Sequence, residues 1–139
     1  MSIDSTRFSG KIEITDAPIA AEAIVAAIKA GGDGAVCVFD GIVRDNTLGR
    51  RTLYLDYEAY REMAEQQIAK ILSEAIARYG LEMAAAEHRV GKVGLGQPGV
   101  VVAVAAAHRT EAFAGGARMV DVGGKAVTAR RARDRKSVV

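Results

Sequence analysis

The spacing of hydrophobic and polar residues along the chain shows two periods, and each period predicts one kind of element. Short runs that alternate or stay apolar, bounded by glycine and polar residues, are typical of strands. They indicate strands over residues 11–14, 34–43, 52–58, 82–90 and 100–107. In the third run Leu53, Leu55 and Tyr57 are expected to share one face. The glycine-rich stretch 91–99 is expected to be a turn region.

Three other segments carry apolar residues three or four positions apart, which is typical of helices with one buried face. They lie between Asp16 and Gly31, from Tyr60 to Tyr79, and from Thr110 to Val122. Asp16 is expected to be an N-cap. Tyr60 and Met63 begin the apolar stripe of the longest helix, so they are expected to pack in the core. The order of elements, β-α-β-β-α-β-β-α, predicts an α+β fold in which helices cover a mostly antiparallel sheet.

The composition is typical of a globular protein. The chain has 139 residues, half of them hydrophobic, so a single domain over residues 1–139 is expected. It shows no apolar signal segment and no apolar stretch of about 18 residues, so the cytoplasm is the expected location and no membrane partner is expected. Cys37 is the single cysteine and is expected to be a buried core thiol, without a disulfide or a metal.

Positive charge is concentrated at the C-terminal end. Residues 125–139 carry a local net charge of +5, whereas the whole chain carries +2. A basic tail can bind nucleic-acid phosphates. A run this short is usually solvated, however, and few aromatic residues are present to stack on bases. Nucleic acid is therefore not an expected partner, and the tail from about Thr128 is expected to be mobile.

Basic residues directly follow two hydrophobic strands. Arg44 comes after the second predicted strand, and His108 and Arg109 come after the last one. If these strands are neighbours, two guanidinium groups and an imidazole can converge on one anion. The alternative is that each side chain reaches water at the edge of the sheet. His88–Arg89 is a second pair of the same kind, and the sequence alone does not rank the two pairs.

Four separated motifs stand in order along the chain. They are FDGIVRDNTLG from Phe39, EAYREMA from Glu58, HRVG from His88 and HRTEAF from His108. Together with the strand that precedes the last motif, they resemble the family of molybdopterin synthase catalytic (large) subunits. The likeness covers roughly residues 10–113.

This resemblance implies an α/β hammerhead fold and a sulfurtransferase that converts cyclic pyranopterin monophosphate into molybdopterin, in molybdenum cofactor biosynthesis. It also implies the partners: a homodimer of this chain, within a heterotetramer that includes a small ubiquitin-like sulfur-carrier subunit ending in a Gly-Gly thiocarboxylate. By the same likeness Ile42, Val43 and Arg44 line the substrate pocket, and His108 and Arg109 bind the phosphate and the pterin end. No metal or other cofactor is implied.

The basic C-terminal segment, from about residue 115, departs from the family pattern. The family carries a helical lysine and then a Pro-x-Trp-Lys segment, but here Gly124 stands at the first lysine position and Arg131 at the second. Lys125, one residue later, is expected to be the catalytic group, and Arg131 is expected to bind substrate. The departure is either a natural variant or a reading-frame change in the gene. The alternative function is that of a non-catalytic relative, which binds the small subunit or an anionic ligand without transferring sulfur.

Overall fold

The computed structural model describes residues 10–47, 49–120 and 127–133. Its helices are α1 (Ala21–Ile28), α2 (Arg61–Tyr79) and α3 (Arg109–Met119). Its strands are β1 (Gly10–Thr15), β2 (Ala35–Ile42), β3 (Asn46–Thr47), β4 (Arg50–Glu58), β5 (Met83–Arg89), β6 (Gly91–Gly94), β7 (Pro98–Ala106) and β8 (Thr128–Arg133).

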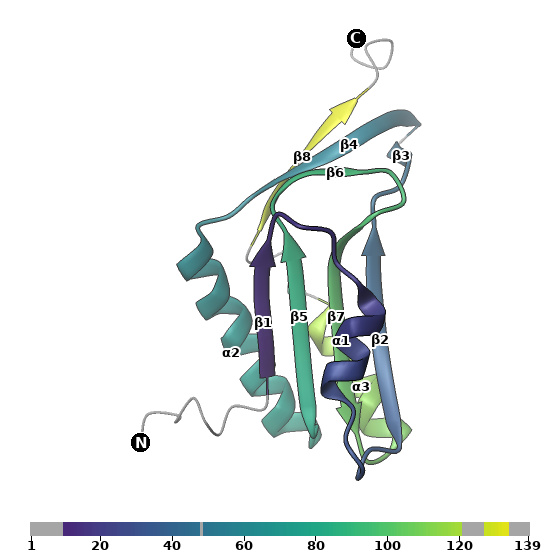
Figure 1. The fold of residues 1–139 in the computed structure, drawn as a ribbon, viewed down its shortest axis with the longest axis vertical. Coiled ribbons are helices and arrows are strands. Elements are labelled where there is room, and N and C mark those ends of the chain that lie inside the picture. Colours follow the sequence, from purple (N-terminus) through teal and green to yellow (C-terminus); the bar gives the residue numbers. More distant parts are fainter. Residues whose placement is uncertain (1–9, 48, 121–126, 134–139) are drawn as a thin grey trace.

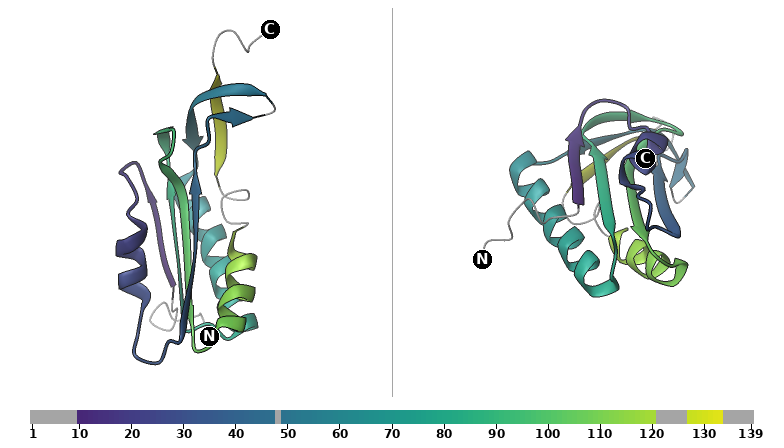
Figure 2. Two further views of the ribbon diagram at one scale, coloured as in Figure 1. Left: turned by 90° about the vertical axis from the view of Figure 1, so that its right-hand side faces the viewer. Right: turned by 60° about the horizontal axis from the view of Figure 1, so that its bottom comes forward.

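Four strands form the main sheet, in the order β1-β5-β7-β2. β1 runs parallel to β5, whereas β7 runs antiparallel to both of its neighbours. One face of this sheet is covered by α1 and the other by α2 and α3 (Figures 1 and 2). The predicted α+β class, with a mostly antiparallel sheet covered by helices, is confirmed.

The two faces of the main sheet bury separate apolar clusters, because successive side chains of a strand point to opposite faces. Ala84 and Ala86 of β5 pack beneath α2 and α3, whereas Ala85 between them packs against α1. In β7 every residue from Val101 to Ala106 is buried. A central strand covered on both faces is apolar throughout, which explains the continuous hydrophobic run that the sequence shows there.

A second, smaller sheet stands at one end of the main sheet (Figure 1). Its order is β3-β4-β6, and β8 pairs antiparallel with β4. β6 begins at Gly91, whose φ is +81°, and only Val90 separates it from the end of β5, so the predicted turn region is wrong for residues 91–94. The expectation of a mobile tail from Thr128 is also wrong for β8. The side of β4 away from β6 offers backbone groups that another strand can pair with, and β8 pairs there.

Two helices begin later than the sequence predicts. α1 follows an N-cap at Ala20, so Asp16 is not its N-cap. On α2 the buried stripe starts at Ala64, whereas Tyr60 is 85% exposed and Met63 is 58% exposed. The prediction that these two side chains pack in the core is wrong, because nothing among the described residues covers the first turn of α2.

The alternation along β4 is interrupted. Leu55 is buried as predicted, but Leu53 is 42% exposed and Thr52 is completely buried. The register between β4 and β8 shifts between Thr52 and Tyr54. A bulge of this kind adds a residue to one strand and turns its side chains to the other face, so the predicted shared face is wrong at Leu53.

Helix α3 confirms the last predicted helix, and the predicted end of that helix at Val122 lies outside the described residues. Gly116 faces the main sheet, where a Cβ would stand 2.9 Å from the Sγ atom of Cys37. Glycine therefore permits a close approach of helix and sheet at this point. Cys37 is half-buried against this helix, rather than fully buried as predicted.

Candidate functional site

The predicted basic residues lie at the two ends of one strand pair. β2 and β7 are neighbours, and their register pairs Ala35 with Ala106 and Ile42 with Pro98. Arg44 therefore lies just beyond one end of the pair, and His108–Arg109 lie just beyond the other. At about 3.3 Å per residue, the two ends are roughly 25 Å apart. The prediction that these groups of a single chain converge on one anion is wrong, because the two neighbouring strands run in opposite directions.

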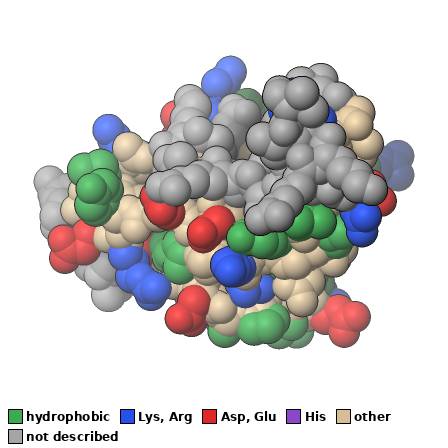
Figure 3. Space-filling model, turned by 90° about the horizontal axis from the view of Figure 1, so that it is seen from above, with side chains coloured by type: hydrophobic (Ala, Val, Ile, Leu, Met, Phe, Trp, Pro, Cys, Tyr) green, Lys and Arg blue, Asp and Glu red, His purple; other side chains and the backbone are tan. Residues whose placement is uncertain are grey.

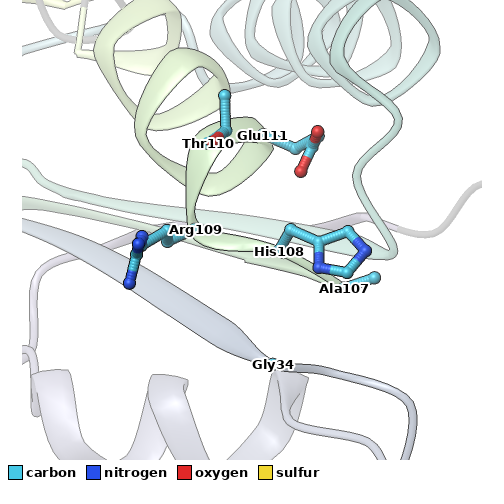
Figure 4. Close-up of a pocket in the computed structure, with 6 residues that line it drawn as sticks. All are labelled: Gly34, Ala107, His108, Arg109, Thr110 and Glu111. Carbon is cyan, nitrogen blue, oxygen red and sulfur yellow. The ribbon is translucent and has the colours of Figure 1, made fainter.

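A cavity of about 520 Å³ opens at the end that carries His108 (Figure 4). It is lined by Gly34, Ala107, His108, Arg109, Thr110 and Glu111. The backbone N–H of Gly34 donates to the carbonyl of Ala106 at 3.0 Å. A Cβ at Gly34 would overlap the carbonyl oxygen of Ala107, so the glycine allows this close approach beside the cavity. We call this hollow the α3 cavity.

The first turn of α3 forms one wall of the α3 cavity. His108 is the N-cap residue, with extended backbone (φ −131°, ψ 153°) and no side-chain cap. The first N–H groups of a helix have no partner within the helix and carry partial positive charge. Together with Arg109, this helix start provides donors for an anion. Figure 4 shows the His108 and Arg109 side chains pointing away from each other, so they face different parts of the cavity.

The other end of β2 is built differently. Val43 is buried against Leu55 and Val93, and its backbone N–H donates to the carbonyl of Gln97 at 3.1 Å. Ile42 is 57% exposed, and Arg44 is exposed beside it. Figure 3, which views the molecule from the small-sheet side, shows basic and acidic side chains interspersed with hydrophobic ones. Val43 thus holds the strand end in place, while Ile42 and Arg44 are free to contact another molecule.

The second basic pair, His88–Arg89, is buried in β5. Nδ1 of His88 lies 2.8 Å from the carbonyl oxygen of Arg89, and because a carbonyl only accepts, Nδ1 donates. The ring of Tyr57 meets the imidazole edge-on at 4.9 Å. Burial lowers the pKa of His88, although the hydrogen bond to Arg89 opposes this shift. His88 is therefore a packed, neutral side chain, and the structure ranks His108–Arg109 as the accessible pair.

The low pKa of His88 predicts that acid weakens the fold. Below about pH 6.5 the unfolded chain binds a proton at His88, whereas the folded chain does not. The free energy of unfolding therefore falls as the pH falls. The slope from this proton is at most about 1.4 kcal/mol per pH unit. Urea unfolding between pH 7.5 and 5.5 is the measurement, and His88→Gln is expected to reduce the slope.

His108→Gln is the matched control for this experiment, because it removes an exposed imidazole. Burial and Glu13 raise the pKa of Glu87, which gives a slope of the opposite sign, so the comparison between variants is the informative quantity. Equal slopes for wild type and His88→Gln would contradict the assignment of a buried neutral His88.

The two C-terminal candidates lie apart from the α3 cavity or outside the described chain. Lys125 lies outside the described residues. Arg131 lies in β8, where the register pairs it with Leu55 of β4. Glu111 lines the α3 cavity but is not among the site residues that the sequence predicts. The feature that could have identified Glu111 from the sequence is its position three residues after His108, in the first turn of the helix that follows.

Metal sites and membrane spans are both absent from the residues that the structure describes. No group of three or more His, Cys, Asp or Glu residues in this part of the chain is arranged to hold a metal ion. No helix of the described ranges has the length and apolar character needed to cross a membrane.

The structure defines an α+β protein with an open cavity at one end of its main sheet. The chain belongs to the MoaE protein family: the model of that family, described as "MoaE protein", matches residues 14–123. This finding confirms the resemblance that the four motifs predict. The matched range ends before Lys125 and Arg131, so these two candidates have no counterpart in it.

Two curated relatives of this chain carry the same name. The chain is 42% identical over 102 residues to the molybdopterin synthase catalytic subunit of Thermoplasma volcanium, which covers 73% of this chain and 74% of the relative. It is 40% identical over 103 residues to the subunit of the same name from Bacillus subtilis, covering 74% and 66%. These relatives support the prediction of a catalytic subunit over that of a non-catalytic relative.

Solved structures show the same fold. The crystal structure of molybdopterin synthase from Staphylococcus aureus matches with a TM-score of 0.83 and 30% identity, over 88% of this chain and 91% of the other. A complex of subunits 1 and 2 of the molybdopterin-converting factor from Helicobacter pylori matches with a TM-score of 0.69 and 20% identity, over 92% and 91%. At that identity the second likeness concerns the fold alone.

Proposed function

We propose that this chain is the catalytic subunit of a molybdopterin synthase. It transfers sulfur from the thiocarboxylated C-terminus of a small ubiquitin-like subunit to cyclic pyranopterin monophosphate. The observation that carries the proposal is the family match over residues 14–123, which includes the cavity-lining pair His108 and Arg109. The curated relatives are named as the catalytic subunit of molybdopterin synthase, which supports a second kind of subunit as a partner for this chain.

The α3 cavity is the proposed phosphate and pterin site. Arg109 offers a planar fork of donors that suits a phosphate, and the start of α3 adds backbone donors. His108 can donate a hydrogen bond or exchange a proton near neutral pH. These three kinds of donor suit a substrate that is both phosphorylated and heterocyclic.

Arg44 joins this site when two copies of the chain pair. β2 is the outer strand of the main sheet, and it has one β-neighbour among the described residues. If β2 of a second copy pairs with it antiparallel, the end that carries Arg44 comes beside the second copy's end that carries His108 and Arg109. Three apolar side chains on this strand are exposed and favour such a contact, namely Val38, Phe39 and Ile42. We therefore propose a homodimer with two shared sites.

The C-terminal segment supplies the remaining groups of the proposed mechanism. Lys125 acts as a general acid or base, or forms a transient covalent link to the carbonyl of the small subunit's tail. Arg131 adds a further positive charge for substrate. β8 pairs with β4 in the small sheet, which places Arg131 at the end of the molecule that carries Arg44 and supports its role (Figure 1).

Dithiolene formation tests the proposed function directly. The purified chain is mixed with thiocarboxylated small subunit and cyclic pyranopterin monophosphate, and molybdopterin is measured after oxidation to its fluorescent derivative. We expect product formation that depends on both reactants. A stable complex with the small subunit that yields no product would contradict sulfur transfer and favour the non-catalytic relative.

A further inference from the structure

Two carboxylates beside the α3 cavity have oxygen atoms whose hydrogen-bonding capacity is unmet. Oε1 of Glu111 and Oδ1 of Asp33 are both buried, and no hydrogen-bond partner reaches either atom within the described residues. Asp33 directly precedes Gly34 of the cavity lining, and its other oxygen accepts the N–H of Ala30 at 2.7 Å. Buried polar atoms in proteins are nearly always hydrogen-bonded, because an unmet one is costly.

Glu111 is the carboxylate that lines the cavity itself. Figure 4 shows its side chain extending to the same side as the imidazole of His108, while Arg109 extends to the other side. Oε1 is closed off from the cavity as it stands, so a ligand can use it only after the carboxylate turns; the last torsion of a glutamate side chain is soft, and this rotation has a small cost. An unmet acceptor is thereby available to a ligand in the cavity.

The usual structural role of a glutamate at this position is not fulfilled. Glu111 is the third residue of α3, where a glutamate commonly accepts the backbone N–H of the N-cap residue. In this chain the buried oxygen of Glu111 has no such partner among the described residues. Capping therefore does not explain this carboxylate, whereas a ligand with N–H donors would satisfy it.

The charges of the cavity also favour a mixed ligand over a simple anion. Arg109 and the start of α3 attract a phosphate, whereas Glu111 repels it. A 2-amino-4-oxo-pteridine has two adjacent donors, the 2-amino group and N3–H, that match the two oxygens of one carboxylate. A ligand with this edge and a phosphate satisfies both kinds of group.

We propose that Glu111 is a specificity-determining residue, whose carboxylate accepts the 2-amino and N3–H donors of the pterin ring. This inference rests on the proposed function, because that function supplies a pterin. It assigns the His108 and Glu111 side of the cavity to the heterocycle and leaves the Arg109 side to the phosphate.

The test compares 6-hydroxymethylpterin with 6-hydroxymethyllumazine, in which a carbonyl replaces the 2-amino group. Binding of each probe to the full chain is measured by fluorescence titration. We expect wild type to bind the pterin about 10- to 100-fold more tightly, the range for hydrogen bonds to a charged group. In Glu111→Gln the preference should fall to about threefold or less, because a carboxamide can donate to the lumazine carbonyl.

Glu62→Gln is the matched control, since Glu62 occupies the first turn of α2 as Glu111 does that of α3. It should retain the full preference. Glu111→Asp is a second variant, which keeps the charge but shortens the side chain, and it should reduce the preference as well. Circular dichroism establishes that each variant is folded.

Wild type that binds both probes equally, or binds neither, would overturn the inference. A pterin preference that Glu111→Gln retains would also overturn it. The proposed function is judged separately by dithiolene formation. Product without a pterin preference removes only the role of Glu111, whereas a Glu111-dependent preference without product removes sulfur transfer and leaves the recognition of the pterin.

Discussion

Arg109→Ala is expected to lower kcat/KM for cyclic pyranopterin monophosphate about 100- to 1000-fold. The guanidinium lies at the α3 cavity, where it can form paired hydrogen bonds to a phosphate. These hydrogen bonds are expected to be as strong in the transition state as in the substrate complex. Removing one positioned donor from such a site typically costs a factor in this range. Steady-state kinetics with saturating thiocarboxylated small subunit is the measurement.

Two further variants test whether the effect depends on the guanidinium group at this particular position. Arg109→Lys keeps the charge but loses the planar fork, so it should recover only part of the activity. Arg61→Ala removes an exposed arginine at the start of α2 and should leave kcat/KM unchanged. Activity within about threefold of wild type in Arg109→Ala would contradict a phosphate site at this cavity.

Lys125→Ala is expected to lower kcat for dithiolene formation about 100- to 10,000-fold, the usual contribution of proton transfer by a positioned group. The complex with the small subunit should still form, because the variant removes one side chain and no strand. Single-turnover kinetics with preformed complex separates this chemical effect from a change in binding.

A lysine elsewhere provides the control for this variant. Lys70→Ala, at an exposed position of α2, should retain the wild-type rate. Lys125→Arg keeps a positive charge, but an arginine does not lose its proton near neutral pH, so it should remain as slow as the alanine variant. A wild-type rate in Lys125→Ala would exclude this residue from the mechanism.

Local spacing predicts elements well in this chain where burial is uniform. β7 is buried on both faces, and its continuous apolar run is by itself typical of a central strand. The middle and end of α2 show the same agreement, since Ile68, Leu72 and Ala75 are buried at helical spacing. Tyr60 and Met63 fit the same pattern but are exposed, because the pattern does not show where the neighbouring element ends.

The candidate site shows what spacing alone leaves undetermined. The sequence identifies Arg44, His108 and Arg109 as strand-end residues, and the structure confirms that each follows its strand. Whether strand ends meet depends on strand direction, which no local pattern encodes. β2 and β7 are antiparallel neighbours, so adjacency in the sheet separates these ends instead of joining them. Glu111 was missed because a glutamate in a first helical turn is usually only a helix-stabilising residue.

The antiparallel register also gives the two predicted halves of the site a way to meet. Each copy presents Arg44 at one end of an outer strand and His108–Arg109 at the other. In the proposed homodimer, a two-fold axis beside β2 brings unlike ends together twice, so each dimer holds two equal sites. Arg44→Ala and Arg109→Ala are then both inactive alone, for the same reason.

Mixing these two inactive variants tests the shared site most directly. Arg44→Ala and Arg109→Ala subunits are unfolded together, refolded at equal concentrations and assayed for dithiolene formation. If the site is shared between copies, half of the dimers are mixed, and one of the two sites in each mixed dimer contains both arginines, so about a quarter of wild-type activity should return. If the mixture stays as inactive as its components, the shared site is contradicted.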